Sequence, residues 1–549
     1  MTILQVSDLS VAFPARDGTV RTVVDRASFS IAAGDVFAIV GESGSGKSMI
    51  ARSIIGLLPA GGRVTSGSIR LGGDELLDLE PARLRDIRGQ RISMIFQEPT
   101  VSLNPTIRIG RQLTEAAERH TTMTLADIEQ RAVDLLERVQ VAEPATAMQR
   151  YPHEFSGGMC QRIMIASALM LEPELLIADE PTTALDCLVQ KDVLEILLDV
   201  SRQEGTSVLL ISHDLSLVAG HSDSVAVIEQ GRIVESGISG EILARPTHNY
   251  TRRLLESLPA AGQGRQSQPE PGMVCTVRDL VVDYPVRRNW FWEKPQFKRV
   301  LDQVNLDIGY GETVALVGES GSGKTTLGKA ILQLVEASQG TITVDGTLVT
   351  GADRPGFQPM SDTVQLVFQN PYAALSPRIN VLDTVAEPLL RGKDTKRERA
   401  RARAMQMLED VGLGAGFAGR LPHELSGGQR QRVSIARALI LSPRLIIADE
   451  PVSALDVTIQ AQILALLQRL RDKHGFSCLF ISHDLGVVES IADRVVVLYR
   501  GEVVETGDTE ALFGTPKHPY TRALLTASPE LRKTGDHRYE LHTREFAEA

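Results

Sequence analysis

Short, continuous runs of apolar residues recur along the chain, and stretches with a helical spacing of apolar residues separate them. Continuous apolar runs are typical of strands that are buried on both faces, as in parallel sheets. The pattern therefore predicts an α/β fold with a mainly parallel core sheet flanked by helices. The runs in the first half are Val36-Phe-Ala-Ile-Val, Leu175-Leu-Ile-Ala, Val208-Leu-Leu-Ile and Val225-Ala-Val-Ile.

The whole pattern occurs twice. Ser156-Gly-Gly-Met recurs as Ser426-Gly-Gly-Gln, and Ile211-Ser-His-Asp recurs as Ile481-Ser-His-Asp, in each case 270 positions later. A repeat of this length indicates a duplicated domain, not a solenoid of short units. Residues 261–272 are rich in Gly, Gln and Pro, which predicts a flexible linker. From the N-terminus, we therefore expect domain 1 at 1–260, the linker, domain 2 at 273–530, and a polar tail at 531–549.

Each copy contains a glycine-rich segment between a predicted strand and a predicted helix, Gly41-Glu-Ser-Gly-Ser-Gly-Lys-Ser and Gly318-Glu-Ser-Gly-Ser-Gly-Lys-Thr. This spacing in this context predicts a phosphate-binding loop, in which backbone N–H groups and a helix N-terminus face the phosphates. The lysine is expected to reach the β- and γ-phosphates of ATP, and the last hydroxyl to hold Mg²⁺. The expected ligands are Gly41, Ser43, Gly44, Gly46, Lys47 and Ser48, and Gly318, Ser320, Gly321, Gly323, Lys324 and Thr325.

An acidic pair ends an apolar strand in each copy, Asp179-Glu180 and Asp449-Glu450. We expect the aspartate to meet Mg²⁺ opposite the phosphate loop. The glutamate is placed to polarise the attacking water as a general base. An acidic pair can instead cap the next helix, but a proline follows each pair at once.

The Ser-Gly-Gly segments, each shortly upstream of a strand that ends in Asp-Glu, resemble the signature of ATP-binding-cassette (ABC) ATPases. The resemblance covers nearly the whole chain and implies two tandem P-loop NTPase domains. Each would add an antiparallel β subdomain and a helical subdomain to its core sheet. It also implies that each ATP is sandwiched between the phosphate loop of one domain and the signature of the other.

The same resemblance implies further site residues, each with its own role. The signature residues are Ser156, Gly157, Gly158, Ser426, Gly427, Gly428 and Gln429; the Q-loop glutamines, near Mg²⁺, are Gln97 and Gln369; the D-loop aspartates are Asp186 and Asp456; the switch histidines are His213 and His483; and the aromatic residues that stack on adenine are Phe13 and Tyr284.

Both copies end in a His-x-Tyr-Thr-Arg segment, at His248 and at His518. These endings look like those of the ATPases of dipeptide, oligopeptide and nickel importers, and the chain resembles both ATPase subunits of such an importer joined into one. The resemblance implies two integral-membrane permease subunits and an extracytoplasmic substrate-binding protein as partners, with the chain peripheral on the cytoplasmic face of the cell membrane. Dipeptides, oligopeptides, glutathione and nickel chelates all remain open as substrates. The chain departs from the pattern at Cys160, where an arginine is usual.

Composition and charge narrow the possible functions, cofactors and partners of the chain. The 549 residues are 43% apolar and 23% charged, as in ordinary soluble proteins. No apolar run approaches the length of a membrane span, and we expect no signal peptide. A net charge of −11 argues against nucleic acid as a partner. The four cysteines lie far apart, so we expect neither an iron–sulfur cluster nor zinc. A twin-cassette translation factor is the alternative function, but such a protein carries a long, charged, helical linker.

Overall fold

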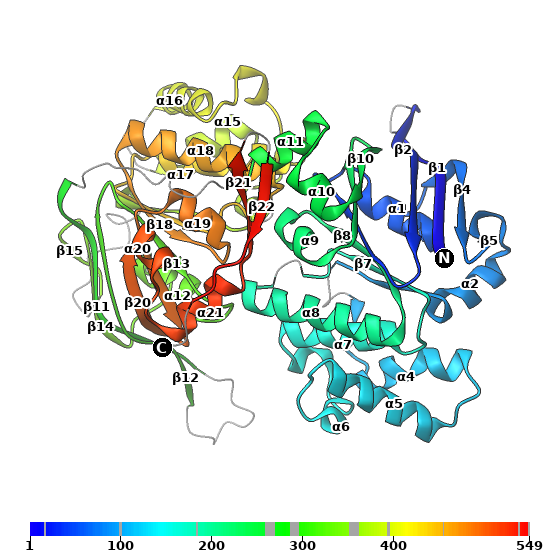
Figure 1. The fold of residues 1–549 in the computed structure, drawn as a ribbon. Coiled ribbons are helices and arrows are strands. Elements are labelled where there is room, and N and C mark those ends of the chain that lie inside the picture. Colours follow the sequence, from blue (N-terminus) through cyan, green and yellow to red (C-terminus); the bar gives the residue numbers. More distant parts are fainter. Residues whose placement is uncertain are drawn as a thin grey trace. The chain divides into compact units, whose positions relative to one another are not determined.

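The computed structural model describes residues 1–15, 18–97, 102–182, 185–258, 270–285, 296–350, 362–391, 396–453, 455–535 and 538–546. The chain divides into two compact units, Met1–Leu258 with Pro529–Thr543, and Pro259–Ser528 with Arg544–Ala549 (Figure 1). The expected linker lies outside the described residues as far as position 269. Its last three residues already belong to strand β11 (Glu270–Pro285).

The core of the first unit is a six-stranded sheet in the order β10-β9-β3-β8-β7-β6. The five strands from β9 to β6 run parallel, and β10 is antiparallel at one edge, which confirms the predicted α/β class. The strands are β3 (Val36–Val40), β6 (Ile92–Ile95), β7 (Leu175–Asp179), β8 (Ser207–Ser212), β9 (Ser224–Glu229) and β10 (Arg232–Ile238).

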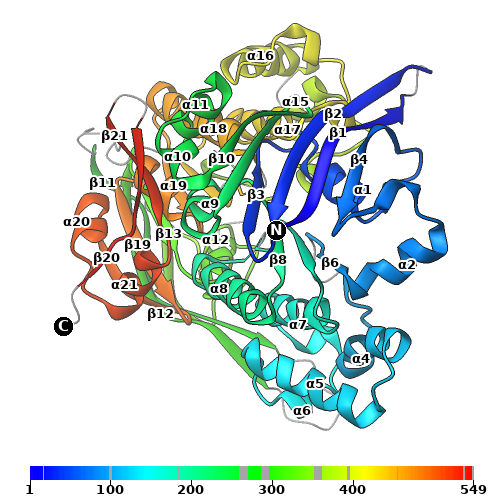
Figure 2. The ribbon, with the colours of Figure 1, turned by 45° about the vertical axis from the view of Figure 1, so that its right-hand side comes forward.

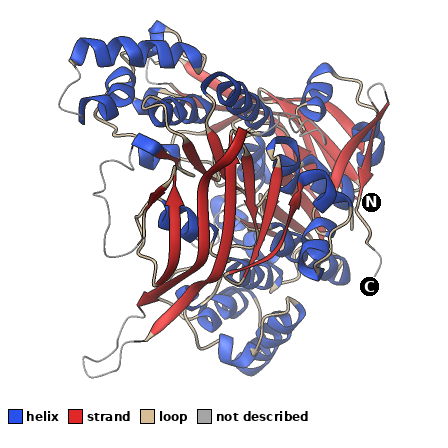
Figure 3. Cartoon of the chain, turned by 90° about the vertical axis from the view of Figure 1, so that its left-hand side faces the viewer, coloured by secondary structure: helices blue, strands red, loops and turns tan. Residues whose placement is uncertain are grey.

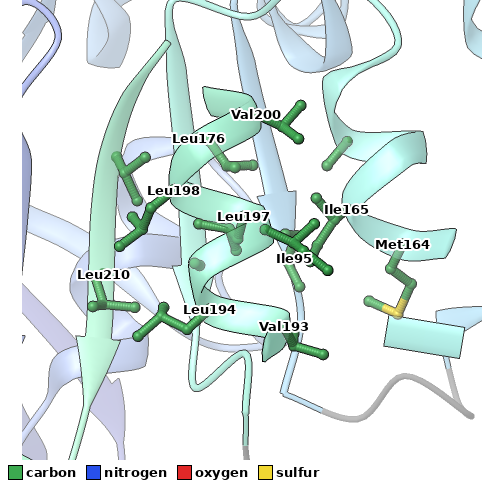
Figure 4. Close-up of a cluster of buried hydrophobic side chains, with 14 of the residues drawn as sticks. Ile95, Met164, Ile165, Leu176, Val193, Leu194, Leu197, Leu198, Val200 and Leu210 are labelled. Carbon is green, nitrogen blue, oxygen red and sulfur yellow. The ribbon is translucent and has the colours of Figure 1, made fainter. Parts of the chain in front are cut away.

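Both faces of this sheet are covered, as continuous apolar strands require. Successive side chains of a strand point to opposite faces, so each strand contributes side chains to two separate buried clusters. Leu176 and Leu210 lie in one cluster, with Leu194 and Leu197 of helix α8 (Cys187–Glu204) (Figure 4). Their neighbours on the same strands, including Leu209, lie in the other cluster.

A second, antiparallel sheet in the first unit has the order β2-β1-β4-β5 (Figure 2). Its strands are β1 (Thr2–Pro14), β2 (Val20–Ala32), β4 (Arg63–Leu71) and β5 (Asp74–Glu75). The other α-helices in the described part of this unit are α1 (Lys47–Ile54), α2 (Pro81–Gln90), α4 (Ile109–His120), α5 (Leu125–Arg138), α6 (Pro144–Ala147), α7 (Gly157–Leu169), α9 (Leu215–His221), α10 (Ser239–Ala244) and α11 (Asn249–Glu256).

The second unit repeats both sheets, with orders β16-β17-β18-β13-β19-β20 and β12-β11-β14-β15. Helices lie along the strands, as the colouring by secondary structure makes clear (Figure 3). The further strands are β12 (Phe297–Tyr310), β13 (Thr313–Val317), β14 (Gln339–Val344), β15 (Thr347–Leu348), β16 (Val364–Val367), β17 (Leu445–Asp449), β18 (Ser477–Ile481), β19 (Arg494–Tyr499) and β20 (Glu502–Asp508). The helices are α12 (Lys324–Ile331), α14 (Pro371–Ala374), α15 (Val381–Arg391), α16 (Arg397–Asp410), α17 (Gly427–Leu439), α18 (Val457–His474), α19 (Leu485–Ile491), α20 (Thr509–Gly514) and α21 (Pro519–Thr526).

The C-terminal segment differs from the polar tail expected at 531–549. It forms a hairpin of β21 (Glu530–Gly535) and β22 (Arg538–His542), which belongs to the first unit and lies beside α9 and α10 (Figure 1). Leu531 and Tyr539 are buried in the larger core cluster of that unit. The pairing places Leu531 opposite Leu541, so these two leucines share one face of a mostly polar hairpin.

Just after the hairpin the chain returns to the second unit. The Arg544 guanidinium pairs with the carboxylate of Glu489 at 2.6 Å and donates to the carbonyl of Phe513 at 3.2 Å. No helix in the described part of the chain is long and apolar enough to cross a bilayer.

Candidate active site

The glycine-rich loop of each unit joins a buried strand to a helix, β3 to α1 and β13 to α12. Glycine is required at its turns. Gly46 adopts a φ of 108°, in the region that favours glycine, and Gly323 adopts 109°. A Cβ at Gly46 would lie 2.9 Å from the carbonyl oxygen of Val23. The loop thus keeps its backbone N–H groups at the start of the helix, as an anion site needs.

The lysine that follows each loop is buried and folded back over it. Lys47 Nζ donates to the carbonyl oxygens of Gly41 at 2.7 Å and Glu42 at 3.0 Å. Lys324 Nζ donates to those of Gly318 at 2.7 Å and Glu319 at 2.8 Å. Each ammonium group is therefore held within the loop that would receive the phosphates.

The hydroxyl after each lysine meets the aspartate at the end of a neighbouring strand. Ser48 Oγ donates to Asp179 Oδ1 at 2.9 Å, and Thr325 Oγ1 donates to Asp449 Oδ1 at 3.1 Å. Burial raises the pKa of both carboxyl groups, although these hydrogen bonds oppose the shift. Hydroxyl and carboxylate oxygens are hard donors of the kind that Mg²⁺ prefers, so both pairs fit that ion.

The glutamate after each aspartate has an unusual backbone. Glu180 adopts a φ of 50° and Glu450 a φ of 45°, which are costly for residues other than glycine. The N–H of Glu180 donates to the carbonyl of Ile211 at 3.0 Å, and that of Glu450 to the carbonyl of Ile481 at 2.9 Å. These bonds to the adjacent strand hold each glutamate in a conformation that it would not adopt alone.

Two further predicted residues lie on the Glu180 carboxylate. Gln97 Nε2 donates to Glu180 Oε2 at 2.7 Å, and His213 Nδ1 lies 3.5 Å from Glu180 Oε1. The hydrogen bond with Glu180 raises the pKa of His213, because it stabilises the charged imidazolium. A glutamine from after β6 and a histidine from after β8 thus hold the carboxylate from both sides.

The second unit repeats this arrangement on Glu450. Gln369 Nε2 donates to Glu450 Oε2 at 2.7 Å, and His483 Nδ1 lies 3.3 Å from Glu450 Oε1. Burial alone would raise the pKa of Glu450, but the hydrogen bond with His483 and the charge of Lys324 lower it. Burial would also lower the pKa of His483, and the bond with Glu450 outweighs that effect and raises it. Both groups are therefore stabilised in their charged forms.

The predicted signature residues begin helices α7 and α17. Ser156 Oγ accepts from the N–H of Met159, and Ser426 Oγ accepts from the N–H of Gln429, each at 3.4 Å. The second glycine of each signature packs against the helix that follows. A Cβ at Gly158 would lie 2.5 Å from Val189 Cγ1, and the same distance separates a Cβ at Gly428 from Ile459 Cγ2.

The two signature helices differ at their first turns. Gln429 Oε1 accepts from the N–H of Ser426 at 3.0 Å and completes a capping box, which the Met159 side chain cannot do. Arg430 Nε donates to the carbonyl of Pro422 at 2.8 Å. Cys160, at the equivalent position of the first unit, offers only a thiol at 3.5 Å from the carbonyl of Pro152. The first signature therefore lacks a positive charge that the second has.

The remaining predicted residues have simpler surroundings. Asp186 caps helix α8, accepting from the N–H of Val189 at 3.1 Å, and Asp456 holds the N-cap position of α18. Phe13 is half-buried near the end of β1, and a Cβ on Gly62 would lie 2.6 Å from its ring. Tyr284 is exposed on β11. Their predicted contacts with nucleotide stay predictions.

Two tyrosines that the sequence did not mark as site residues touch the phosphate loops. The hydroxyl of Tyr250 accepts from the N–H of Glu42, and that of Tyr520 accepts from the N–H of Glu319. Both stand in the His-x-Tyr-Thr-Arg segments that end the two copies. The presence of this segment at the same place in both copies was the available signal.

Comparison with known proteins gives consistent matches over both units. Residues 24–183 and 301–453 match the family described as ABC transporter. Residues 234–280 and 504–548 match the oligopeptide/dipeptide transporter C-terminal region. The chain is 44% identical over 528 residues to the peptidoglycan transport ATP-binding protein YejF of Agrobacterium fabrum, covering 96% of each chain.

A second relative is named for a different transported substrate. The chain is 41% identical over 559 residues to the glutathione import ATP-binding protein GsiA of Pectobacterium atrosepticum, covering 96% of this chain and 89% of that one. Among solved structures, the dimeric post-hydrolysis state of the ATP-binding cassette MJ0796 matches with 32% identity and a TM-score of 0.38, covering 43% of this chain and 98% of that one.

Proposed function

This chain belongs to the ABC transporter family and carries the ATPase cassette of that family twice, and we propose that it is the energy-coupling subunit of a bacterial importer of the dipeptide and oligopeptide class. It is an ATPase coupled to transport. The peptide class is supported by the C-terminal region of oligopeptide and dipeptide transporters, which matches in both copies. Glutathione, named for one relative, is itself a small peptide; peptidoglycan, named for another, and nickel chelates are the other candidates.

Each unit supplies the groups that ATP hydrolysis needs. Lys47 and the loop amides bind the phosphates, and Ser48 with Asp179 and Gln97 would hold Mg²⁺, which when bound neutralises charge on the phosphates. Glu180 accepts the proton of the attacking water, Gln97 orients that carboxylate, and His213 contacts the γ-phosphate. The equivalent set of the second unit is Lys324, Thr325, Asp449, Gln369, Glu450 and His483.

The two ATP sites are composite in this proposal. The phosphate loop at Lys47 works with the signature at Ser426, and the loop at Lys324 works with the signature at Ser156. Support comes from the signature serines, which cap the N-termini of helices, where backbone N–H groups favour an anion. Fusion in one chain supplies each cassette with its partner at a high effective concentration. Asp186 and Asp456 serve as D-loop residues, and Phe13 and Tyr284 stack on adenine.

The chain works with two integral-membrane permeases and an extracytoplasmic substrate-binding protein, from the cytoplasmic face of the membrane. The observation that carries the proposal is the duplicated cluster on Glu180 and Glu450, in a chain whose copies both end in the importer-type segment. Purification of the tagged chain from detergent-solubilised membranes tests it. Two integral-membrane proteins should co-purify with it. Recovery with ribosomes in high salt, and with no membrane protein, would contradict the proposal.

A further inference from the structure

The His-x-Tyr-Thr-Arg segments reach back to the phosphate loops. Tyr250 lies at the start of α11 and Tyr520 at the start of α21, and both are at least nine-tenths buried, with 4% and 8% of their surface exposed. The Tyr250 hydroxyl accepts from the N–H of Glu42 at 3.1 Å. The Tyr520 hydroxyl accepts from the N–H of Glu319 at 2.8 Å. The same contact therefore occurs in both units.

The residue whose N–H each tyrosine contacts also accepts a hydrogen bond from the lysine of the loop. The carbonyl oxygen of Glu42 accepts from Lys47 Nζ at 3.0 Å, and that of Glu319 accepts from Lys324 Nζ at 2.8 Å. The backbone of this one residue thus bonds the phenol through its N–H group and the ammonium group through its carbonyl oxygen. Because the carbonyl helps to place the ammonium group, fixing the N–H side also fixes where the lysine lies.

The turn that precedes each tyrosine is held by a carboxylate from the neighbouring strand. Glu235 of β10 accepts from the N–H of Thr247 at 2.8 Å, from the N–H of His248 at 3.1 Å and from Thr251 Oγ1 at 2.6 Å. In the second unit Glu505 of β20 accepts from the N–H groups of Lys517 and His518 at 2.7 and 3.0 Å. These bonds fix the turn that begins each helix, and the tyrosine is in its first turn.

The surroundings of the two rings differ, whereas the target of the two hydroxyls does not. The Tyr250 ring lies under the Arg253 guanidinium, at 5.7 Å from the ring centre. The Tyr520 ring packs on the ring of Tyr499, with centres 4.2 Å apart. Ring packing alone would not require a hydroxyl, so the feature shared by both units is the bond to the loop N–H.

We propose that Tyr250 and Tyr520 are positioning residues, which hold the second residue of each phosphate loop, and through it the loop lysine, in the arrangement that binds ATP. The proposal rests on the ATP sites described under Proposed function. It gives the C-terminal segment of each copy a direct link to nucleotide affinity. It also predicts that the hydroxyl matters more than the ring.

The test compares Tyr250→Phe, Tyr520→Phe and the double variant in the full chain. Loss of one neutral hydrogen bond corresponds to a change of about 2- to 12-fold in an equilibrium constant. We expect Kd for ATP, measured by calorimetry in the Glu180→Gln, Glu450→Gln background, to rise by this factor at the altered site. In the otherwise unaltered chain, KM for ATP should rise by a similar factor, while kcat stays within about 2-fold because the glutamates that accept the proton of the attacking water are unchanged.

Tyr539→Phe is the matched control. Tyr539 is buried in the same core cluster as Tyr250, and its hydroxyl has no hydrogen-bond partner within the described residues. Unchanged Kd and KM in the Tyr250 and Tyr520 variants, equal to those of Tyr539→Phe, would overturn the inference while leaving the proposed function intact. A fall in kcat with no change in KM would also overturn it. Absence of ATP binding by the wild-type chain would overturn both proposals.

Discussion

Replacing both candidate bases, Glu180→Gln with Glu450→Gln, should abolish turnover and leave ATP binding intact. Glutamine has the size of glutamate and keeps an oxygen that can accept from Gln97, which lies 2.7 Å from Glu180. It cannot accept a proton from water at neutral pH. The lysine, the hydroxyl residue and the aspartate of each site are untouched, so the groups that would bind phosphate and Mg²⁺ remain.

The expected loss follows from the role assigned to these carboxylates. Removing a general base costs about 10²- to 10⁴-fold in rate, which corresponds to about 2.7 to 5.4 kcal/mol of transition-state stabilisation. Phosphate release at saturating Mg-ATP measures turnover, and nucleotide retained after rapid gel filtration measures binding. The variant should retain nucleotide better than the wild type, because bound ATP is not consumed.

Glu129→Gln is the control for this experiment, since Glu129 is exposed on helix α5 and lies in neither cluster. It should hydrolyse ATP at the wild-type rate. A double Glu180, Glu450 variant with a rate within about tenfold of the wild type would refute the assignment of both bases.

Three further predictions concern packing and burial. Leu531→Asp should lower the free energy of unfolding of the first unit by about 2–4 kcal/mol in denaturant titrations, because it puts a charge at a buried site. Leu541→Asp, at a site that is 39% exposed, should lower it by under about 1 kcal/mol. Equal losses in the two variants would contradict the burial of Leu531. Gly158→Ala should lower the free energy of unfolding by about 1–3 kcal/mol, because the added methyl group overpacks against Val189. Gly157→Ala, whose Cβ would lie 3.9 Å from Leu185, should lower it less. The reverse order of the two variants in thermal melts would count against this packing. Burial raises the pKa of Cys275 and of Cys478 to about 12, so about one thiol in 10⁴ is ionised at pH 8. Both thiols should therefore resist alkylation by iodoacetamide until the chain is unfolded in urea. Alkylation of the native chain at the rate of the unfolded chain would contradict this.

The parts of the fold that sequence predicted best are those set by local pattern. Continuous apolar runs became buried parallel strands, and the 270-residue offset became two units with the same sheet orders. Ser48 and Asp179 were each singled out from local motifs. The structure adds that they meet at 2.9 Å, across 131 positions of sequence.

Other features depend on contacts that no local pattern contains. The positive φ of Glu180 arises from a bond to a neighbouring strand, and nothing in Asp-Glu-Pro specifies it. The C-terminal segment was predicted to be a polar tail, yet Leu531 and Tyr539 are buried. Their burial depends on the surface of α9 and α10, which lies about three hundred positions earlier. The Tyr250 contact was missed for the same reason.

The number of ATP molecules retained per chain is the most direct test, because it asks whether the chain holds two composite sites. In the Glu180→Gln, Glu450→Gln background we expect two. Adding Lys47→Ala with Ser426→Ala damages one site twice, so one ATP should remain. Adding Lys47→Ala with Ser156→Ala damages both sites, so retention should fall below one, toward zero. Equal retention by the two combinations, or the reverse order, would contradict the pairing of each phosphate loop with the signature of the other cassette.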